Sequence, residues 1–341
     1  MTPLVGPVPR KSARRRVLAA ALGVTAVLAV SASAAQARPA STNLSLVAYS
    51  TPAGAFSKII PAFQATPAGK DVTFNQSYAA SEQQSKAVDQ GLPADVVNFS
   101  IEPDMTRLVR DGLLSPSWKN NQYKGIISRS VVVFVVRKGN PKHVKTWDDI
   151  VKPGVKVVVP NPLTSGGARW AILSAYGAER RYGKTDKQAQ GYLQTLFKSN
   201  IVSQDKSARD ALNTFLAGKG DVLLTYENEA ILAQQKGQAL FYVIPKATLR
   251  IDTPIAVLDK SQNKPLAQAF VKFLYCEPAQ EIWGSVGYRP VDKTALANFK
   301  FPVRPWLFTI DSPFLGGWAK ANTRFFDPQT GIVTKIEQNL G

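Results

Sequence analysis

A short stretch near the middle of the chain combines residue types that can bind an anion. Ser165-Gly166-Gly167 follows a β-branched run, 155–159, that predicts a buried strand, and it precedes a helical pattern over 166–181. The first four N–H groups of a helix have no acceptor within it, and the summed peptide dipoles place partial positive charge there. The stretch therefore predicts a site where an oxyanion docks on backbone N–H groups without a charged side chain.

Arg169 lies in the first turn of the same predicted helix. A cation there costs about 0.3–1 kcal/mol unless an anion is nearby, so its presence favours the anion site. The alternative is structural, because serine is a common N-cap where a strand turns into a helix. This stretch alone leaves both interpretations open.

Serine recurs at other junctions between strands and helices. Ser81 and Ser207 each follow a predicted strand and begin a helix, and Ser81 with Gln84 matches a capping box. Ser50 ends the first strand in the same topological position. Such loops gather at the carboxyl ends of the strands in an open α/β sheet, so helix starts can face one cleft. Each serine could be only a helix cap, and it is their recurrence that favours a binding site.

The proposed donors narrow the choice of anion. N–H and O–H groups suit a fully ionised tetrahedral dianion, whereas phosphate near neutral pH carries a proton that needs an acceptor. A buried polar group without a partner costs about 1–3 kcal/mol, which corresponds to tenfold to hundredfold discrimination. Glu82, Asp210 and Glu227 lie close in sequence to the donors, and any one that points inward would restore phosphate as a candidate.

The elements that position these residues alternate along the chain. We predict strands at 44–49, 72–76, 95–99, 130–137, 155–159, 201–202 and 222–226. We predict helices at 53–63, 81–90, 105–111, 146–151, 166–181, 186–197, 208–217 and 227–236, with a polar loop at 203–207. This alternation predicts an α/β fold with doubly wound sheets whose strand ends carry the binding loops.

A chain of 341 residues is long enough for two lobes. We place lobe 1 at 43–129 and 250–341, and lobe 2 at 130–249. The β-branched run 130–137 makes the first crossing between lobes, and 251–258 returns the chain to lobe 1.

Single histidine and cysteine residues restrict the chemistry. The chain has no second cysteine for a disulfide with Cys276, and beyond His143 it has no imidazole for a Ser/His/Asp relay or a histidine metal site. We therefore predict no catalytic residue, no metal site and no cofactor. His143, between lysines, is expected at the surface, and Cys276 is expected to be a buried residue near a helix end.

The chain is strongly basic, with a formal net charge of +18. Five of these charges lie in an N-terminal segment without acidic residues, so the remainder carries 18 − 5 = +13, which attracts anions at long range. After residue 37 no run of Lys and Arg exceeds two, so we predict no nucleic-acid binding.

Residues 1–37 have the pattern of an export signal. Arg14-Arg15-Arg16 precedes an apolar segment, 17–30, and Ala35-Gln36-Ala37 forms a small-x-small cleavage site. The apolar segment is short for a membrane span. The arginines resemble a twin-arginine signal, with ordinary unfolded export as the alternative. The segment lacks cysteine, so we predict a periplasmic or extracytoplasmic protein without a lipid anchor.

Several motifs together resemble one family, the prokaryotic sulfate-binding proteins that deliver sulfate or thiosulfate to an ABC permease. The strongest match is the stretch 161–169, Asn-Pro-Leu-Thr-Ser-Gly-Gly-Ala-Arg, which is close to that family's Asn-Pro-Lys-Ser/Thr-Ser-Gly-Gly-Ala-Arg signature. Further matches lie at 134–141, 220–223, 227–230, 288–290, 307–311 and 316–319.

The resemblance implies a two-lobed, periplasmic-binding-protein-like fold of type II that closes over its ligand in the cleft between the lobes. It implies sulfate donors at the positions occupied here by Ser81, Ser165, Gly166, Gly167 and Ala208. It also implies a non-enzymatic partner of a membrane permease, and we expect a monomer.

Three positions depart from the family pattern. Leu163 replaces the usual lysine of the signature, beside the cleft. Tyr226 stands where well-known members place a tryptophan whose indole N–H donates to sulfate, and a phenol can donate from a different reach. Ser50 replaces an aspartate near the ligand. We include Tyr226 and Ser50 among the expected ligand-binding residues and leave the choice between sulfate and thiosulfate open.

Two other functions are considered beside sulfate binding. The first is binding of phosphate or another tetrahedral oxyanion. The second is a sulfo- or phosphoryl-transferase, which would need a nucleophile or base beside the anion. Trp283, Trp306 and Trp318 are expected in the core or between the lobes rather than at the ligand.

Overall fold

The computed structural model describes residues 42–340, and the predicted export signal lies outside them. The strands are β1 (Asn43–Tyr49), β2 (Thr73–Ala79), β3 (Val96–Asn98), β4 (Ile126–Arg137), β5 (Val157–Pro160), β6 (Ile201–Asp205), β7 (Val222–Tyr226), β8 (Leu240–Val243), β9 (Ala247–Val257), β10 (Arg289–Pro290) and β11 (Trp306–Phe308). The helices of the first part of the chain are α1 (Ala53–Gln64), α2 (Ser81–Asp89), α3 (Glu102–Arg110), α4 (Trp147–Ile150), α5 (Gly166–Arg181), α6 (Asp186–Thr195), α7 (Ala208–Leu216) and α8 (Glu227–Gln235). The later helices are α9 (Lys264–Leu274), α10 (Glu277–Ser285), α11 (Lys293–Ala297), α12 (Gly317–Phe326) and α13 (Ile332–Gln338).

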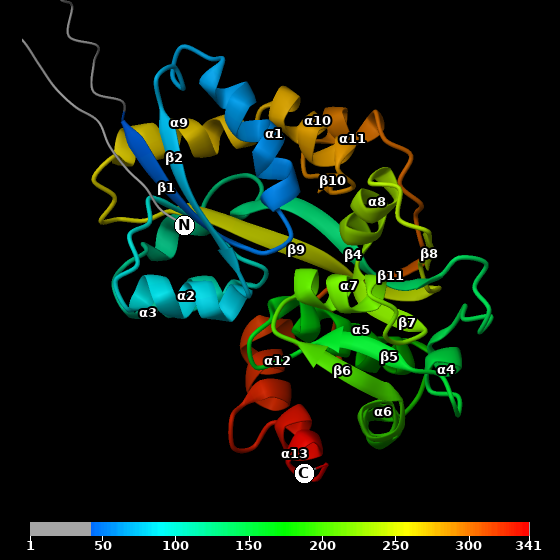
Figure 1. Cartoon of the computed structure of the whole chain (residues 1–341). Helices are drawn as coiled ribbons and strands as arrows, with labels where there is room; N and C mark the ends of the chain where they lie inside the picture. Colours follow the sequence, from blue (N-terminus) through cyan, green and yellow to red (C-terminus); the bar gives the residue numbers. More distant parts are fainter. Residues whose placement is uncertain (1–41, 341) are drawn as a thin grey trace, which may run out of the picture. The chain divides into compact units, whose positions relative to one another are not determined.

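Two long antiparallel strands connect two sets of parallel strands (Figure 1). The order of the sheet is β2-β1-β3-β9-β4-β7-β5-β6, with β8 and β10 paired to β4 and β11 paired to β9. We call β2-β1-β3 the first strand set and β7-β5-β6 the second strand set; each is internally parallel. The chain is thus α/β with a mixed sheet, and the two long strands β4 and β9 are the structural link between the sets.

Helices cover both faces of each strand set. Helices α1, α9 and α10 share a core with one face of β1, and α2 and α3 share a core with the other. On the second set, α5 and α6 pack with one face and α7 and α8 with the other. Alternate residues of β4 supply both of these cores, because Val132 and Phe134 face one and Val131 and Val133 face the other. The expected doubly wound arrangement is therefore confirmed.

The apolar spacing of the sequence explains the individual elements. In α1 the predicted residues Phe56, Ile59, Ile60 and Phe63 are buried on one face. Helix α5 spans 166–181 as predicted, and burial of nearly its whole length fits its position between the sheet and the C-terminal segment. Strand β7 also has the predicted bounds. Periodicity thus located the elements that carry the proposed site.

Other element boundaries differ from the prediction. Strand β6 continues to Asp205, so the expected polar loop 203–207 is mostly strand, and it pairs with β5. Helix α6 ends at Thr195 and gives way to a π-helical turn, Leu196–Asn200. Strands β4 and β9 each begin about four residues earlier than predicted, since each extends across the junction between the two strand sets.

The C-terminal segment packs with the second strand set. Phe308, Leu315 and Phe325 share a core with Val159 and Trp170. Helix α13 contacts α6, while α12 also contacts α3 (Figure 1). The segment from β11 onwards therefore contacts α3, but most of its buried apolar residues pack against the second strand set.

Several single residues lie as expected and one does not. His143 is exposed, and Trp283 and Trp318 are buried, as predicted, with Trp306 half-buried. Cys276 is exposed, so its predicted burial is wrong, although it does lie at a helix end, as the N-cap residue of α10. Within residues 42–340 the structure contains no helix long and apolar enough to cross a membrane.

Candidate functional site

The helix starts selected from the sequence meet at one place. The amide of Glu82, in the first turn of α2, donates to the carbonyl of Thr164 just before α5, at 3.2 Å. Arg209, in the first turn of α7, donates to the carbonyl of Thr51 just after β1, at 3.3 Å. Thus the carboxyl ends of β1 and β5 and the starts of three helices surround a common point, as the topology of an open α/β sheet predicts.

Gly166 and Gly167 lie where the surrounding side chains leave no room for a Cβ atom. A methyl group on Gly167 would stand 2.9 Å from Tyr226 Cε2 and 3.2 Å from Ala208 Cβ. One on Gly166 would stand 2.5 Å from Ser100 Oγ. Since contacts under about 3 Å are not tolerated, only glycine fits both positions, and the helix start can be approached closely. We call Ser81, Gly166, Gly167, Ala208 and Tyr226 the cradle.

The expected site residues differ in how closely they join the cradle. Ser165 is the N-cap residue of α5 and is buried, but its hydroxyl makes no capping hydrogen bond. Ser50 is half-buried after β1, and no hydrogen bond within residues 42–340 ties its side chain to the other expected donors. Leu163 is exposed beside them, as expected. The structure thus brings Ser165 to the cradle and leaves Ser50 at its border.

Ser81 is not the helix cap that its capping-box pattern predicted. Ala80 is the N-cap residue of α2, and the Ser81 hydroxyl donates instead to Asp104 Oδ2 at 2.5 Å. The side chain of Gln84 bonds to Ser77 and to the carbonyl of Ala48 rather than to the helix start. The buried carboxylate of Asp104 outcompetes the capping interaction, because it is a stronger acceptor. Ser207, by contrast, does cap α7, accepting the amide of Asp210.

The carboxylates near the site are engaged by the protein. Glu82 pairs with Arg169 at 2.5 Å, and Glu227 pairs with Arg289 at 2.7 Å. Asp210 is exposed and accepts the hydroxyl of Ser207. Phosphate would need a carboxylate that points inward and accepts its proton. Glu82, Asp210 and Glu227 all have other partners, so none of them restores phosphate as a candidate.

Arg169 has a different explanation from the one its position suggested. Its guanidinium contacts Glu82, the carbonyl of Pro162 and the side chain of Asn322. The anion that offsets the unfavourable helix position is thus the Glu82 carboxylate, so Arg169 is no sign of a bound ligand. The pair joins α5 to α2, and both side chains are largely buried.

Tyr226 is a buried, neutral phenol beside Ser100. Its ring lies 6.1 Å from that of Tyr49, and its hydroxyl lies 2.7 Å from the hydroxyl of Ser100. Burial raises the pKa of Tyr226 well above its ordinary value, so the phenol keeps its proton. Burial likewise raises the pKa of Asp104, to about 6.

Ser100 and Asp104 are functional candidates that the sequence reasoning missed. Ser100 follows β3 and touches Gly166 and Tyr226, and Asp104 fixes the hydroxyl of Ser81. Ser100 obeys the rule used for the other serines, since it lies beyond the carboxyl end of a strand. Asp104 gave no such signal, because its partner is 23 residues away in sequence.

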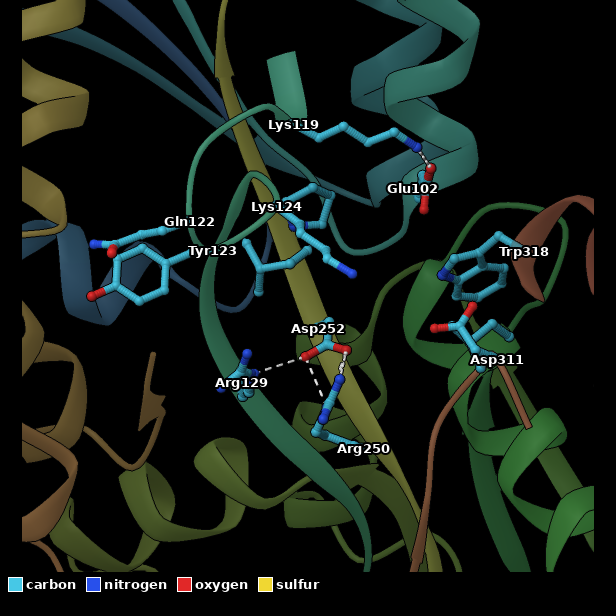
Figure 2. A pocket seen from close by; sticks show the side chains of 13 residues that line it. Glu102, Lys119, Gln122, Tyr123, Lys124, Arg129, Arg250, Asp252, Asp311 and Trp318 are labelled. Carbon is cyan, nitrogen blue, oxygen red and sulfur yellow. Dashed lines mark hydrogen bonds and ion pairs between the residues drawn. The ribbon is translucent and has the colours of Figure 1, made fainter. Parts of the chain in front are cut away.

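A separate cavity of 610 Å³ lies against the crossing strands β4 and β9. Figure 2 shows Asp252 between Arg129 and Arg250 among the residues that line it, with Lys124 nearby. None of the expected site residues lines it. Within residues 42–340 no cluster of three or more His, Cys, Asp or Glu residues could hold a metal ion.

Comparisons with known proteins identify relatives over most of the chain. Residues 44–289 match the family model described as bacterial extracellular solute-binding protein. The sulfate-binding protein of Synechococcus elongatus is 41% identical, over 87% of each chain. The thiosulfate-binding protein of Pseudomonas aeruginosa is 35% identical, over 92% of this chain and 96% of the relative.

Solved structures agree with these relatives. The sulfate-binding protein SubI from Mycobacterium tuberculosis has a TM-score of 0.81 and 42% identity, over 84% of this chain and all of that one. The periplasmic binding protein AfuA from Actinobacillus pleuropneumoniae has a TM-score of 0.61 at 18% identity, over 87% of this chain and 96% of that one, which shows the fold alone. The two-lobed periplasmic-binding-protein fold expected from the resemblance is thereby confirmed.

Proposed function

This chain belongs to the bacterial extracellular solute-binding proteins, and from that membership we propose that it captures sulfate or thiosulfate outside the cytoplasm and delivers the anion to an ABC permease. The observation that carries the proposal is the convergence of Gly166, Gly167, Ala208 and Tyr226 from separate elements on one point. Relatives named for sulfate and for thiosulfate binding both support this ligand class.

The cradle would hold the anion by backbone and hydroxyl donors. The amides at the start of α5 have no acceptor within the helix and carry partial positive charge. The amides of Ser81 and Ala208, each the first residue of a helix, add donors from two further directions. We propose Ser165 and Tyr226 as hydroxyl donors and Ser50 as a residue at the border of the site.

The lobe division that we propose follows the strand sets. The crossings near residues 130 and 250 lie within the paired parts of β4 and β9. Because β11, α12 and α13 share a core with the second strand set, we now assign 306–338 to lobe 2 instead of lobe 1. Ser81 and Ala208 are buried, so capture requires the lobes to open and release requires the same motion.

Several finer points belong to the same proposal. We propose that residues 1–37 are a cleaved export signal, that the mature chain is a monomer without a lipid anchor, and that it performs no catalysis. The family of extracellular binding proteins supports a location outside the cytoplasm, and the relatives' names as binding proteins support a role in binding. Phosphate is not favoured, because Glu82 and Glu227 are both paired with arginines.

Isothermal titration of the chain from residue 38 tests the ligand. We expect one-site binding of sulfate or thiosulfate without change of the ligand, and no heat with phosphate. Tight phosphate binding, or binding of none of the three anions, would contradict the proposal.

Gly166→Asp tests the site. The new carboxylate would occupy the space against Ser100 Oγ and repel an anion at the start of α5, so sulfate binding should be lost. Gly191→Asp is the matched control, since a side chain on this α6 glycine meets no atom within 4 Å. Unchanged sulfate affinity in Gly166→Asp would contradict the site assignment.

A further inference from the structure

Ser100 uses all of its polar groups in hydrogen bonds at the cradle, and two of them reach the other lobe. It is 1% exposed and lies between β3 and α3. Its amide donates to Ser81 Oγ at 2.8 Å, and its carbonyl accepts the indole N–H of Trp170, on α5, at 2.9 Å. Its hydroxyl lies 2.7 Å from that of Tyr226, at the end of β7. Ser100 therefore links the first strand set to both α5 and β7.

A count of the hydroxyl protons shows which hydroxyl groups can donate a hydrogen bond to a bound anion. A serine hydroxyl has one proton, and that of Ser81 goes to Asp104. Ser81 Oγ also accepts the amide of Ser100. While Asp104 is ionised, Ser81 therefore offers a ligand only its backbone N–H.

The hydroxyl groups of Ser100 and Tyr226 have two protons between them, and their mutual hydrogen bond uses one. Within residues 42–340, neither hydroxyl has a second hydrogen-bond partner. One O–H is therefore left over in a buried place, where an unmade hydrogen bond is costly. A methyl group on Gly166 would stand 2.5 Å from the Ser100 hydroxyl, and one on Gly167 would stand 3.1 Å from that of Tyr226, so the leftover O–H lies beside the first turn of α5.

We propose that Ser100 and Tyr226 act as one donor unit, in which their shared hydrogen bond fixes a single O–H toward the bound oxyanion; this inference rests on the proposed function. Ser100 thereby becomes a residue that determines anion affinity, and Tyr226 depends on it for orientation. Within the unit, the bond between the hydroxyls also polarises the outward O–H and strengthens its donation. The unit assembles only when the lobes are closed, because its two members come from different lobes.

A double-mutant cycle tests whether the two residues act together. Sulfate affinity is measured by titration calorimetry for the wild-type chain, Ser100→Ala, Tyr226→Phe and the double variant. Each single change leaves one O–H but removes the hydrogen bond that orients and polarises it, so we expect each to weaken binding by about 10- to 100-fold. We expect the double variant to be no weaker than the weaker single variant, because the remaining hydroxyl of a single variant is no longer held toward the anion.

Ser100→Ala is expected to fold, because it keeps both backbone hydrogen bonds of residue 100. Ser85→Ala is the matched control; this serine is also buried on the α2 side, where its hydroxyl donates to the carbonyl of Asp104, and its loss should leave affinity within about twofold. A purely structural effect of Ser100→Ala would persist in the Tyr226→Phe background, which the cycle detects.

The outcomes separate this inference from the function on which it rests. If the wild-type chain binds neither sulfate nor thiosulfate, the proposed function itself fails. If the wild type binds and Ser100→Ala binds equally well, only the donor unit is overturned. Losses that multiply in the double variant would also overturn it, since they would show two independent roles.

Discussion

Two carboxylates beside the start of α2 have opposite surroundings. Glu82 is paired with Arg169 and lies 3.0 Å from Lys86, so cations compensate its charge. Asp104 is 1% exposed and accepts the hydroxyl of Ser81. Burial raises its pKa to about 6, although Arg169 and the hydrogen bond from Ser81 oppose the shift. Asp104 is therefore the carboxylate whose ionisation should cost the folded chain free energy near neutral pH.

Asp104→Asn should flatten part of the dependence of stability on pH. The pKa of Asp104 in the folded chain, about 6, lies above the ordinary value of 3.8. Its contribution to stability is therefore fully present below pH 3.8 and is lost as the pH rises through 6. From about pH 4.5 to 7.5, the wild type should lose about 2 kcal/mol more unfolding free energy than the variant.

Urea unfolding of both proteins at the two pH values gives this difference, because the other titrating groups contribute equally to each. Parallel curves for the wild type and Asp104→Asn would show that the carboxylate titrates alike in the folded and unfolded chains.

At the scale of elements, α5 connects the site to the rest of the molecule. Its first turn forms part of the cradle, and its middle packs on the C-terminal segment, where a methyl group on Gly177 would stand 2.4 Å from Phe308 Cε2. Trp170 lies between these regions and packs edge-on against Trp318 with ring centroids 4.6 Å apart. The position of the proposed anion donors is thus set by a helix that is packed along nearly its whole length.

Two glycine-to-alanine changes in helices should have opposite effects. Gly177→Ala should destabilise the fold by about 1–3 kcal/mol, because Phe308 and Phe314 must move. Gly191→Ala in α6 meets nothing within 4 Å and should stabilise it by up to about 1 kcal/mol, because alanine favours the helix. Thermal unfolding measures both. A rise in melting temperature for Gly177→Ala would show that α5 is not tightly held at this point.

Local sequence patterns predicted these elements well but not the partners of their side chains. The bounds of α5 and β7 follow from apolar spacing and flanking turn residues, which act over a few positions. The roles of Ser81 and Arg169 depend on Asp104 and Glu82, which lie 23 and 87 residues away. Cys276 was predicted to be buried from its apolar character, yet it is the exposed N-cap residue of α10. Tertiary pairing, which the local pattern does not encode, decided the roles of Ser81 and Arg169.

At the scale of the whole molecule, β4 and β9 are the only strands that pair across the two strand sets within residues 42–340. Arg129 and Arg250 share the carboxylate of Asp252 on one face of this crossing (Figure 2). On the cradle side, α2 meets α5 through Glu82 and Arg169, and Ser100 meets Tyr226. If the lobes move about a hinge at the crossing, these cradle contacts form when the lobes close and break when they open.

Glu82→Gln should accelerate the release of sulfate more than it slows capture. The amide keeps the shape of the side chain but removes the charge that Arg169 faces, so the closed arrangement loses a largely buried ion pair. Encounter takes place with the open arrangement, in which the pair is not formed. We expect dissociation about 10-fold faster and association within about twofold of the wild type, measured by stopped-flow tryptophan fluorescence. Asp259→Asn is the control, because its pair with Lys264 is exposed and involves no residue of the cradle. Slower association with unchanged dissociation would mean that Glu82 acts on the incoming anion and not on closure.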